Sequence, residues 1–228
     1  MILPTIHLAA WADPSGDPWR VLGNSGFARP AIAGLADLAL ARRLAVAPAA
    51  DDEGPGGRRL SLVPGPPVGG LTAFVEQTLA GVTKQLDVDR AVRSLRDLGP
   101  QVDAALVASG DLVEQGRRGM FGKRTAYAPV AERAGAAQSS IRMPGLPLSA
   151  AGRALVLIAT TGLSAKRMAR LTGGPLAPEL STLSPWQDFD PGLLAPDGAP
   201  IGPMVADLLD ALVLELAGTS DTTDWLDD

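Results

Sequence analysis

Apolar residues recur at helical spacing along most of this chain. Their spacing of three and four residues predicts amphipathic helices over residues 30–42, 71–86, 88–98, 100–112, 150–162, 166–171 and 203–217. The clearest predicted face consists of Leu71, Phe74, Val75, Thr78, Leu79, Val82 and Leu86. Residues typical of helix N-termini support three of these helices. Pro30 and Pro100 suit the first turn of a helix, and Ser149 suits an N-cap.

Two other segments carry signals for β-hairpins. Residues 44–46 and 59–63 are predicted strands, and the stretch 48–70 around them is rich in Pro and Gly, which indicates a surface excursion. Residues 113–129 break the helical pattern and contain glycines around a turn. They predict a second hairpin with its tip near residues 119–122.

The remaining segments lack a clear period. Residues 2–10 are expected to form a short strand or a buried segment, 19–29 a loop, and 173–202 an irregular, Pro-rich connection. Hydrophobic residues make up 46% of the chain and aromatic residues only 4%, so the core must be mainly aliphatic. We predict a mainly α fold, a single helical domain with a bundle core and two small β-hairpins over residues 1–218, followed by an acidic tail over 219–228.

Composition removes several classes of catalytic site. The chain has no Cys, which excludes disulfides and Cys-ligated metal centres, and its single His, His7, excludes a site with several His ligands. His7 lies in an apolar stretch, which is more typical of a half-buried structural side chain than of a catalytic triad. Neighbouring carboxylates such as Asp87 and Asp89 favour solvation or helix capping. No phosphate-binding loop or dinucleotide motif fits. We expect a non-enzymatic protein with no metal and no cofactor.

The hydropathy and charge of the chain indicate its surroundings. No apolar run reaches the roughly 18 residues that span a bilayer, and the N-terminus lacks the features of a signal peptide, which predicts a cytoplasmic protein. All the Lys and Arg residues lie within 1–170, whereas 171–228 holds only acidic charges. A mildly basic body can meet an anionic surface on one face. Arg greatly outnumbers Lys, and Ala and Gly are abundant, which indicates a GC-rich, bacterial genome.

Arginines recur every third residue at Arg90, Arg93 and Arg96. On a helix this spacing places them along one stripe. Guanidinium groups bind phosphate bidentately, so the stripe is a candidate anion site. The alternative is a solvated helix face on which Asp89 and Asp97 pair with the arginines.

The tip of the second predicted hairpin combines four basic and two apolar side chains. Basic side chains at such a tip would meet anionic headgroups while the apolar pair enters the membrane interface. A nucleic-acid-binding wing or an oligomer contact would use the same loop. The residues are Arg117, Arg118, Met120, Phe121, Lys123 and Arg124.

Four segments occur in an order that resembles a known family. They are LADLALARRL at 35–44, SLRDL at 94–98 with LVASGDL at 106–112, TAYAP at 125–129, and RALVLIA at 153–159. This order is similar to that of the Golgi phosphoprotein 3 family of phosphoinositide-binding peripheral membrane adaptors, and the similarity extends over most of residues 2–217. The resemblance implies a mainly helical single domain that binds lipid and catalyses no reaction.

The resemblance also implies a lipid-headgroup pocket. Trp19 matches the family's Trp, and Arg96 matches the first of a later Arg pair. Arg29 matches the family's first Arg when the intervening loop is allowed one extra residue. The second Arg of that pair falls on Gly99, and Arg93 can substitute for it from the same stripe.

These observations predict a peripheral membrane protein that binds an anionic, phosphoinositide-like headgroup. It would present a surface to a client protein, and self-association is a further expectation. The alternative is a winged-helix-like nucleic-acid-binding module that uses the hairpin 113–129 after the helix 100–112. Asp103 and Asp111 on that helix, together with a pI of 4.9, disfavour a nucleic-acid partner.

Overall fold

The computed structural model describes most of the chain in eight segments. They are residues 1–22, 27–47, 57–66, 68–118, 124–145, 148–180, 182–183 and 189–220. The fold is mainly helical with two small two-stranded antiparallel sheets, which confirms the predicted fold class.

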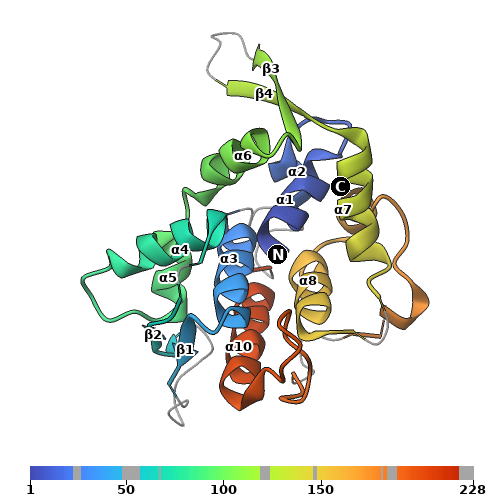
Figure 1. The fold of residues 1–228 in the computed structure, drawn as a ribbon. Coiled ribbons are helices and arrows are strands. Elements are labelled where there is room, and N and C mark those ends of the chain that lie inside the picture. The colour runs from blue at the N-terminus through green and yellow to red at the C-terminus, as the bar shows by residue number, and fades with distance from the viewer. Residues whose placement is uncertain are drawn as a thin grey trace.

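The helices follow one another with few strands between them (Figure 1). The helices are α1 (Ile2–Trp11), α2 (Pro18–Leu22), α3 (Ala28–Leu40), α4 (Gly70–Ala80), α5 (Val88–Ser94), α6 (Leu98–Ala108), α7 (Ala131–Arg142), α8 (Ala150–Thr160), α9 (Ala165–Thr172) and α10 (Gly202–Ser220), with a 3-10 turn at Pro178–Leu180. The strands are β1 (Leu44–Val46), β2 (Leu60–Leu62), β3 (Leu112–Arg118) and β4 (Arg124–Pro129).

Helix α3 forms the centre of the bundle, and every one of its residues is buried. It packs against α1, α4, α5, α8 and α10, and Figure 1 shows it among these helices. Small side chains on α3 allow its neighbours to pack closely against it. At Gly34 an added Cβ would come within 3.0 Å of Val75 Cγ2 on α4, so glycine sets the α3–α4 distance.

The first segment is a helix, so the expectation of a strand or an irregular buried segment at residues 2–10 is wrong. Eight of its ten residues are buried, so no polar face marks the helical period in the sequence. A distant residue caps the helix. The carboxylate of Asp37 on α3 accepts hydrogen bonds from the amides of Ile2 at 2.8 Å and Leu3 at 3.0 Å. These two amides have no partner within their own helix.

Several helix boundaries differ from the predictions. Residues 19–29 are not simply a loop, because α2 occupies part of them and α3 begins at Ala28. Helix α4 ends at Ala80, before Gly81, and α5 ends at Ser94. Helix α7 was absent from the sequence predictions, because only Ala134, Ala137 and Ile141 of its residues are buried and two of these are alanines.

The strands of both hairpins agree with the sequence predictions, and the predicted tip near residues 119–122 lies outside the described residues. Strands β1 and β2 pair in antiparallel register and pack against α10, α3 and α4. Strands β3 and β4 pair from Leu112 opposite Pro129 to Arg118 opposite Arg124, with an irregularity beside Gly116. Figure 1 shows this second hairpin projecting from the helical body. None of the helices in the described segments is both long and apolar enough to cross a membrane.

Candidate functional site

The base of the β3–β4 hairpin is fixed to the helical body by a buried cluster. Leu112 is 1% exposed, and the Tyr127 ring contacts Trp11 edge-on with 5.5 Å between ring centroids. Trp11 Nε1 donates a hydrogen bond of 2.7 Å to Asp103 Oδ1, and His7 Nε2 lies 2.8 Å from the same oxygen. The Asp103 carboxylate therefore joins α1 to α6, and Tyr127 of the hairpin packs against Trp11 at this junction.

The single histidine of the chain, His7, is part of this cluster. His7 is 1% exposed, more buried than the half-buried position expected from sequence. A side chain so enclosed cannot meet a substrate without opening the fold. Asp103 belongs to the helix that the alternative interpretation would use for DNA recognition. Its carboxylate contacts Trp11 and His7 of α1.

The outer end of the hairpin carries the predicted basic residues. Arg118 and Arg124 occupy directly opposed positions in the strand pair, and Arg117 is opposite Thr125. Met120, Phe121 and Lys123 lie outside the described residues, so their predicted membrane contact stays a prediction.

Arg29 lies in the core of the fold, and its predicted role in a lipid-headgroup pocket stays a prediction. Its exposed fraction is 0%. Nη1 donates to the carbonyl oxygen of Ile158, and Nη2 donates to that of Thr161 at 2.8 Å. These carbonyls lie at the C-terminal end of α8, where a cation is favourable. Burial lowers the pKa of Arg29 to about 9, so it remains charged near neutral pH. The sequence could not show that α8 covers this position.

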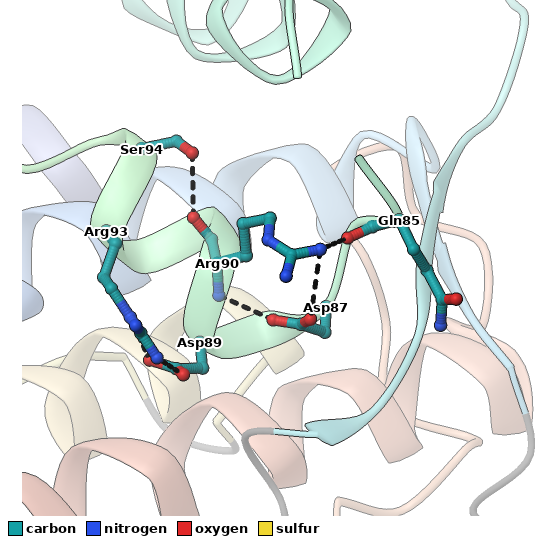
Figure 2. Close-up of polar contacts among 6 residues, drawn as sticks. All are labelled: Gln85, Asp87, Asp89, Arg90, Arg93 and Ser94. Carbon is teal, nitrogen blue, oxygen red and sulfur yellow. Dashed lines mark hydrogen bonds and ion pairs between the residues drawn. The ribbon is translucent and has the colours of Figure 1, made fainter. Parts of the chain in front are cut away.

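The predicted arginine stripe is only partly helical. Arg90 and Arg93 lie on α5, whereas Arg96 follows the end of the helix at Ser94. Each has a carboxylate partner. Figure 2 shows Arg93 beside Asp89, with 2.8 Å between Nε and Oδ1. The partner of Arg96 is Asp97, with 3.5 Å between Nε and Oδ2.

Figure 2 also shows the N-cap of α5 and the contacts of the Arg90 side chain. Asp87 is the N-cap of α5 and accepts a 2.7 Å hydrogen bond from the amide of Arg90. The Arg90 side chain donates to the carbonyl of Gln85 and lies 3.7 Å from the Asp87 carboxylate. The small cavity here, about 170 Å³, is lined by two carboxylates and two guanidinium groups.

This balance makes the α5 cluster a poor preformed anion site. Glu215 on α10 adds a third carboxyl, whose pKa is raised by burial and lowered in part by the charge of Arg93. A phosphate would have to displace Asp89 from Arg93 and would face these acids. The bound arginines fit the alternative interpretation of a solvated, ion-paired helix face.

The predicted pocket residues also come from elements with different neighbours. Trp19 lies on α2, which packs against α1 and α9. Arg93 lies on α5, which packs against α3, α4 and α10. The helices that carry Trp19 and Arg93 therefore have different packing partners, and the predicted pocket stays a prediction.

A cavity that the sequence did not reveal lies between α8, α9 and the segment after α9. Its volume is about 720 Å³, and its lining is mainly apolar. The lining residues are Leu157, Thr160, Thr161, Gly162, Ala165, Met168, Ala169, Gly174, Pro175, Leu176, Leu180 and Leu183. They come from three segments whose proximity depends on tertiary packing, so no local motif marks them.

Comparison with models of known protein families finds no match, and comparison with curated proteins finds none either. The resemblance to the Golgi phosphoprotein 3 family stays a prediction.

Proposed function

We propose that this protein acts by binding, and that it docks on anionic membrane surfaces through the β3–β4 hairpin. The observation that carries the proposal is the basic outer end of a projecting, firmly anchored arm (Figure 1). Arg117, Arg118 and Arg124 lie where the two strands end, and the chain between them adds Lys123.

Anchoring at the base supports this role. A docking arm must transmit its contact to the body, and the contacts of Trp11 with Tyr127 and Asp103 fix the arm to two helices. Each basic residue near an anionic surface contributes about 1 kcal/mol to binding.

The sequence between the strands supports a membrane over a nucleic acid. Met120 and Phe121 would enter the interface while the bases remain at the headgroups. A winged-helix module would need α6 as its recognition helix, and Asp103 of that helix is engaged with α1. Headgroup recognition by Arg93 and Arg96 remains a competing location for the membrane contact.

Co-sedimentation with anionic vesicles, run beside a gel shift with random duplex DNA, tests the proposal. The wild type should sediment with anionic vesicles, bind neutral vesicles poorly and leave DNA unshifted. The double variant Met120→Asp with Phe121→Asp should lose the vesicle binding that persists in high salt, because the apolar contribution is not screened. A DNA shift without vesicle binding would support the nucleic-acid alternative instead.

A further inference from the structure

The cavity between α8 and α9 has the size and lining of a small-molecule site. Its volume of about 720 Å³ falls within the roughly 300–1,000 Å³ typical of ligand pockets. At about 30 Å³ for each non-hydrogen atom, taken from the share of a water molecule in the liquid, it holds roughly two dozen atoms. Leu157, Met168, Leu176, Leu180 and Leu183 contribute apolar surface. An aliphatic group suits this lining.

The chain segment that supplies most of the cavity lining is rich in basic residues, although one of them, Arg170, forms an ion pair with Asp13. Residues 133–178 contain six basic residues and no acidic one, and this stretch supplies most of the lining. Lys166 is exposed on α9, and Ala169 of the lining follows it by three residues, which makes the two neighbours on the helix surface. No carboxylate in the described segments forms an ion pair with Lys166.

A second positive charge lies behind the cavity wall. Arg29 Nη2 donates to the carbonyl oxygen of Thr161, which is a lining residue. Arg29 is fully buried, and its hydrogen-bond partners in the described segments are carbonyl oxygens rather than a carboxylate. Its charge is therefore not neutralised locally, and an anionic ligand would experience it at low dielectric.

From this combination we infer that the cavity binds a single-chain anionic amphiphile, such as a long-chain carboxylate taken up from water. The aliphatic chain occupies the apolar cavity, and the carboxylate lies toward Lys166. This site is distinct from the hairpin, and its ligand binding does not depend on membrane docking.

Isothermal titration of the delipidated full-length protein with laurate and myristate tests the inference. Myristate should bind about tenfold more tightly than laurate, because each buried methylene contributes up to about fourfold in affinity. Tetradecyltrimethylammonium, which has the same chain length and the opposite charge, should bind much more weakly. Failure of the wild type to bind either carboxylate, or a preference for the cation, overturns the inference.

Matched variants locate the ligand. Ala169 is an exposed residue at the cavity, and Ala104 is an exposed residue on α6 away from it. Ala169→Trp should weaken myristate binding at least about tenfold, whereas Ala104→Trp should leave it unchanged, with circular dichroism confirming that both fold. Lys166→Gln should weaken binding severalfold, and Lys84→Gln should not. Equal affinities across either pair overturn the assignment.

The vesicle assay separates this site from the hairpin. Ala169→Trp should sediment with anionic vesicles as the wild type does, and the hairpin variant should bind myristate as the wild type does. Loss of vesicle binding in Ala169→Trp would assign the cavity to a bilayer acyl chain and overturn uptake from water.

Discussion

Asp37 joins the start of α1 to the central helix, and its removal should destabilise the fold measurably. Its carboxylate accepts the amides of Ile2 and Leu3, which are each 2% exposed. Asp37→Ala leaves two buried donors without this acceptor, at about 1–3 kcal/mol each. Relief of the buried charge offsets part of that loss, so we expect the unfolding free energy to fall by about 2–4 kcal/mol.

Urea and thermal unfolding, followed by circular dichroism, measure this loss. For a chain of this size the midpoint should fall by about 2–4 °C for each kcal/mol, hence roughly 5–15 °C. Asp37→Asn keeps one acceptor oxygen and should lose about half as much. Asp97, whose side chain is 90% exposed, provides the matched control, because Asp97→Ala should change stability by less than about 0.5 kcal/mol. Equal stabilities of the Asp37→Ala and Asp97→Ala variants would refute the capping argument.

The same residue predicts a pH dependence. Burial raises the pKa of Asp37, although the bonds from Ile2 and Leu3 oppose the rise. Because the pKa of Asp37 is higher in the folded state than the unfolded-state value of 3.8, protonation of Asp37 stabilises the folded state. This stabilisation is complete below pH 3.8 and is lost as the pH rises through the folded-state pKa. The unfolding free energy of the wild type, measured relative to Asp37→Asn, should therefore decrease as pH rises through this range. An increase would contradict the assigned cause of the shift.

Three further substitutions test the packing of the fold by urea unfolding. Asp103→Ala removes the shared acceptor of Trp11 and His7 and should cost about 2 kcal/mol, whereas a loss below about 0.5 kcal/mol would show that the cluster does not anchor the hairpin. Gly34→Leu overfills the contact between α3 and α4 and should cost about 1–3 kcal/mol or more. Gly135→Ala, on a part of α7 with open space around the added methyl, should stabilise by about 0.5–1 kcal/mol. Equal effects at the two glycines would contradict this packing.

Local patterns predicted the helices that have one buried face. Ser149 caps α8 as expected, because its hydroxyl accepts the amide of Gly152 at 3.1 Å. The hairpin at residues 112–129 was likewise predictable from its glycines and alternation. Helix α1 was not, because burial on nearly all sides removes the polar stripe that marks a helix.

The proposed headgroup pocket shows the limit of residue types and spacing. Arg29 and Arg93 are both arginines near helices, yet one is 0% exposed and the other has a side chain 71% exposed. The burial of Arg29 depends on the packing of α8 over the start of α3. For the cavity, the sequence offered one usable signal, the absence of acidic residues over 133–178.

Membrane docking through the hairpin is tested most directly by two charge-matched triple variants. One variant changes Arg117, Arg118 and Arg124 to Gln, and the other changes Arg90, Arg93 and Arg96 to Gln. Both lose three positive charges, so the net charge of the protein is the same in the two variants. Arg90 and Arg93 on α5, and Arg96 just after its end, form surface ion pairs, each worth about 0–1 kcal/mol, so both proteins should fold.

The measurement is the affinity of each triple variant for anionic vesicles at low salt. Removing three hairpin bases should cost about 3 kcal/mol, which is roughly a hundredfold in affinity. The α5 variant should stay within a few-fold of the wild type. A hundredfold loss in the α5 variant with an unchanged hairpin variant would contradict the account and move the contact to the arginines of α5.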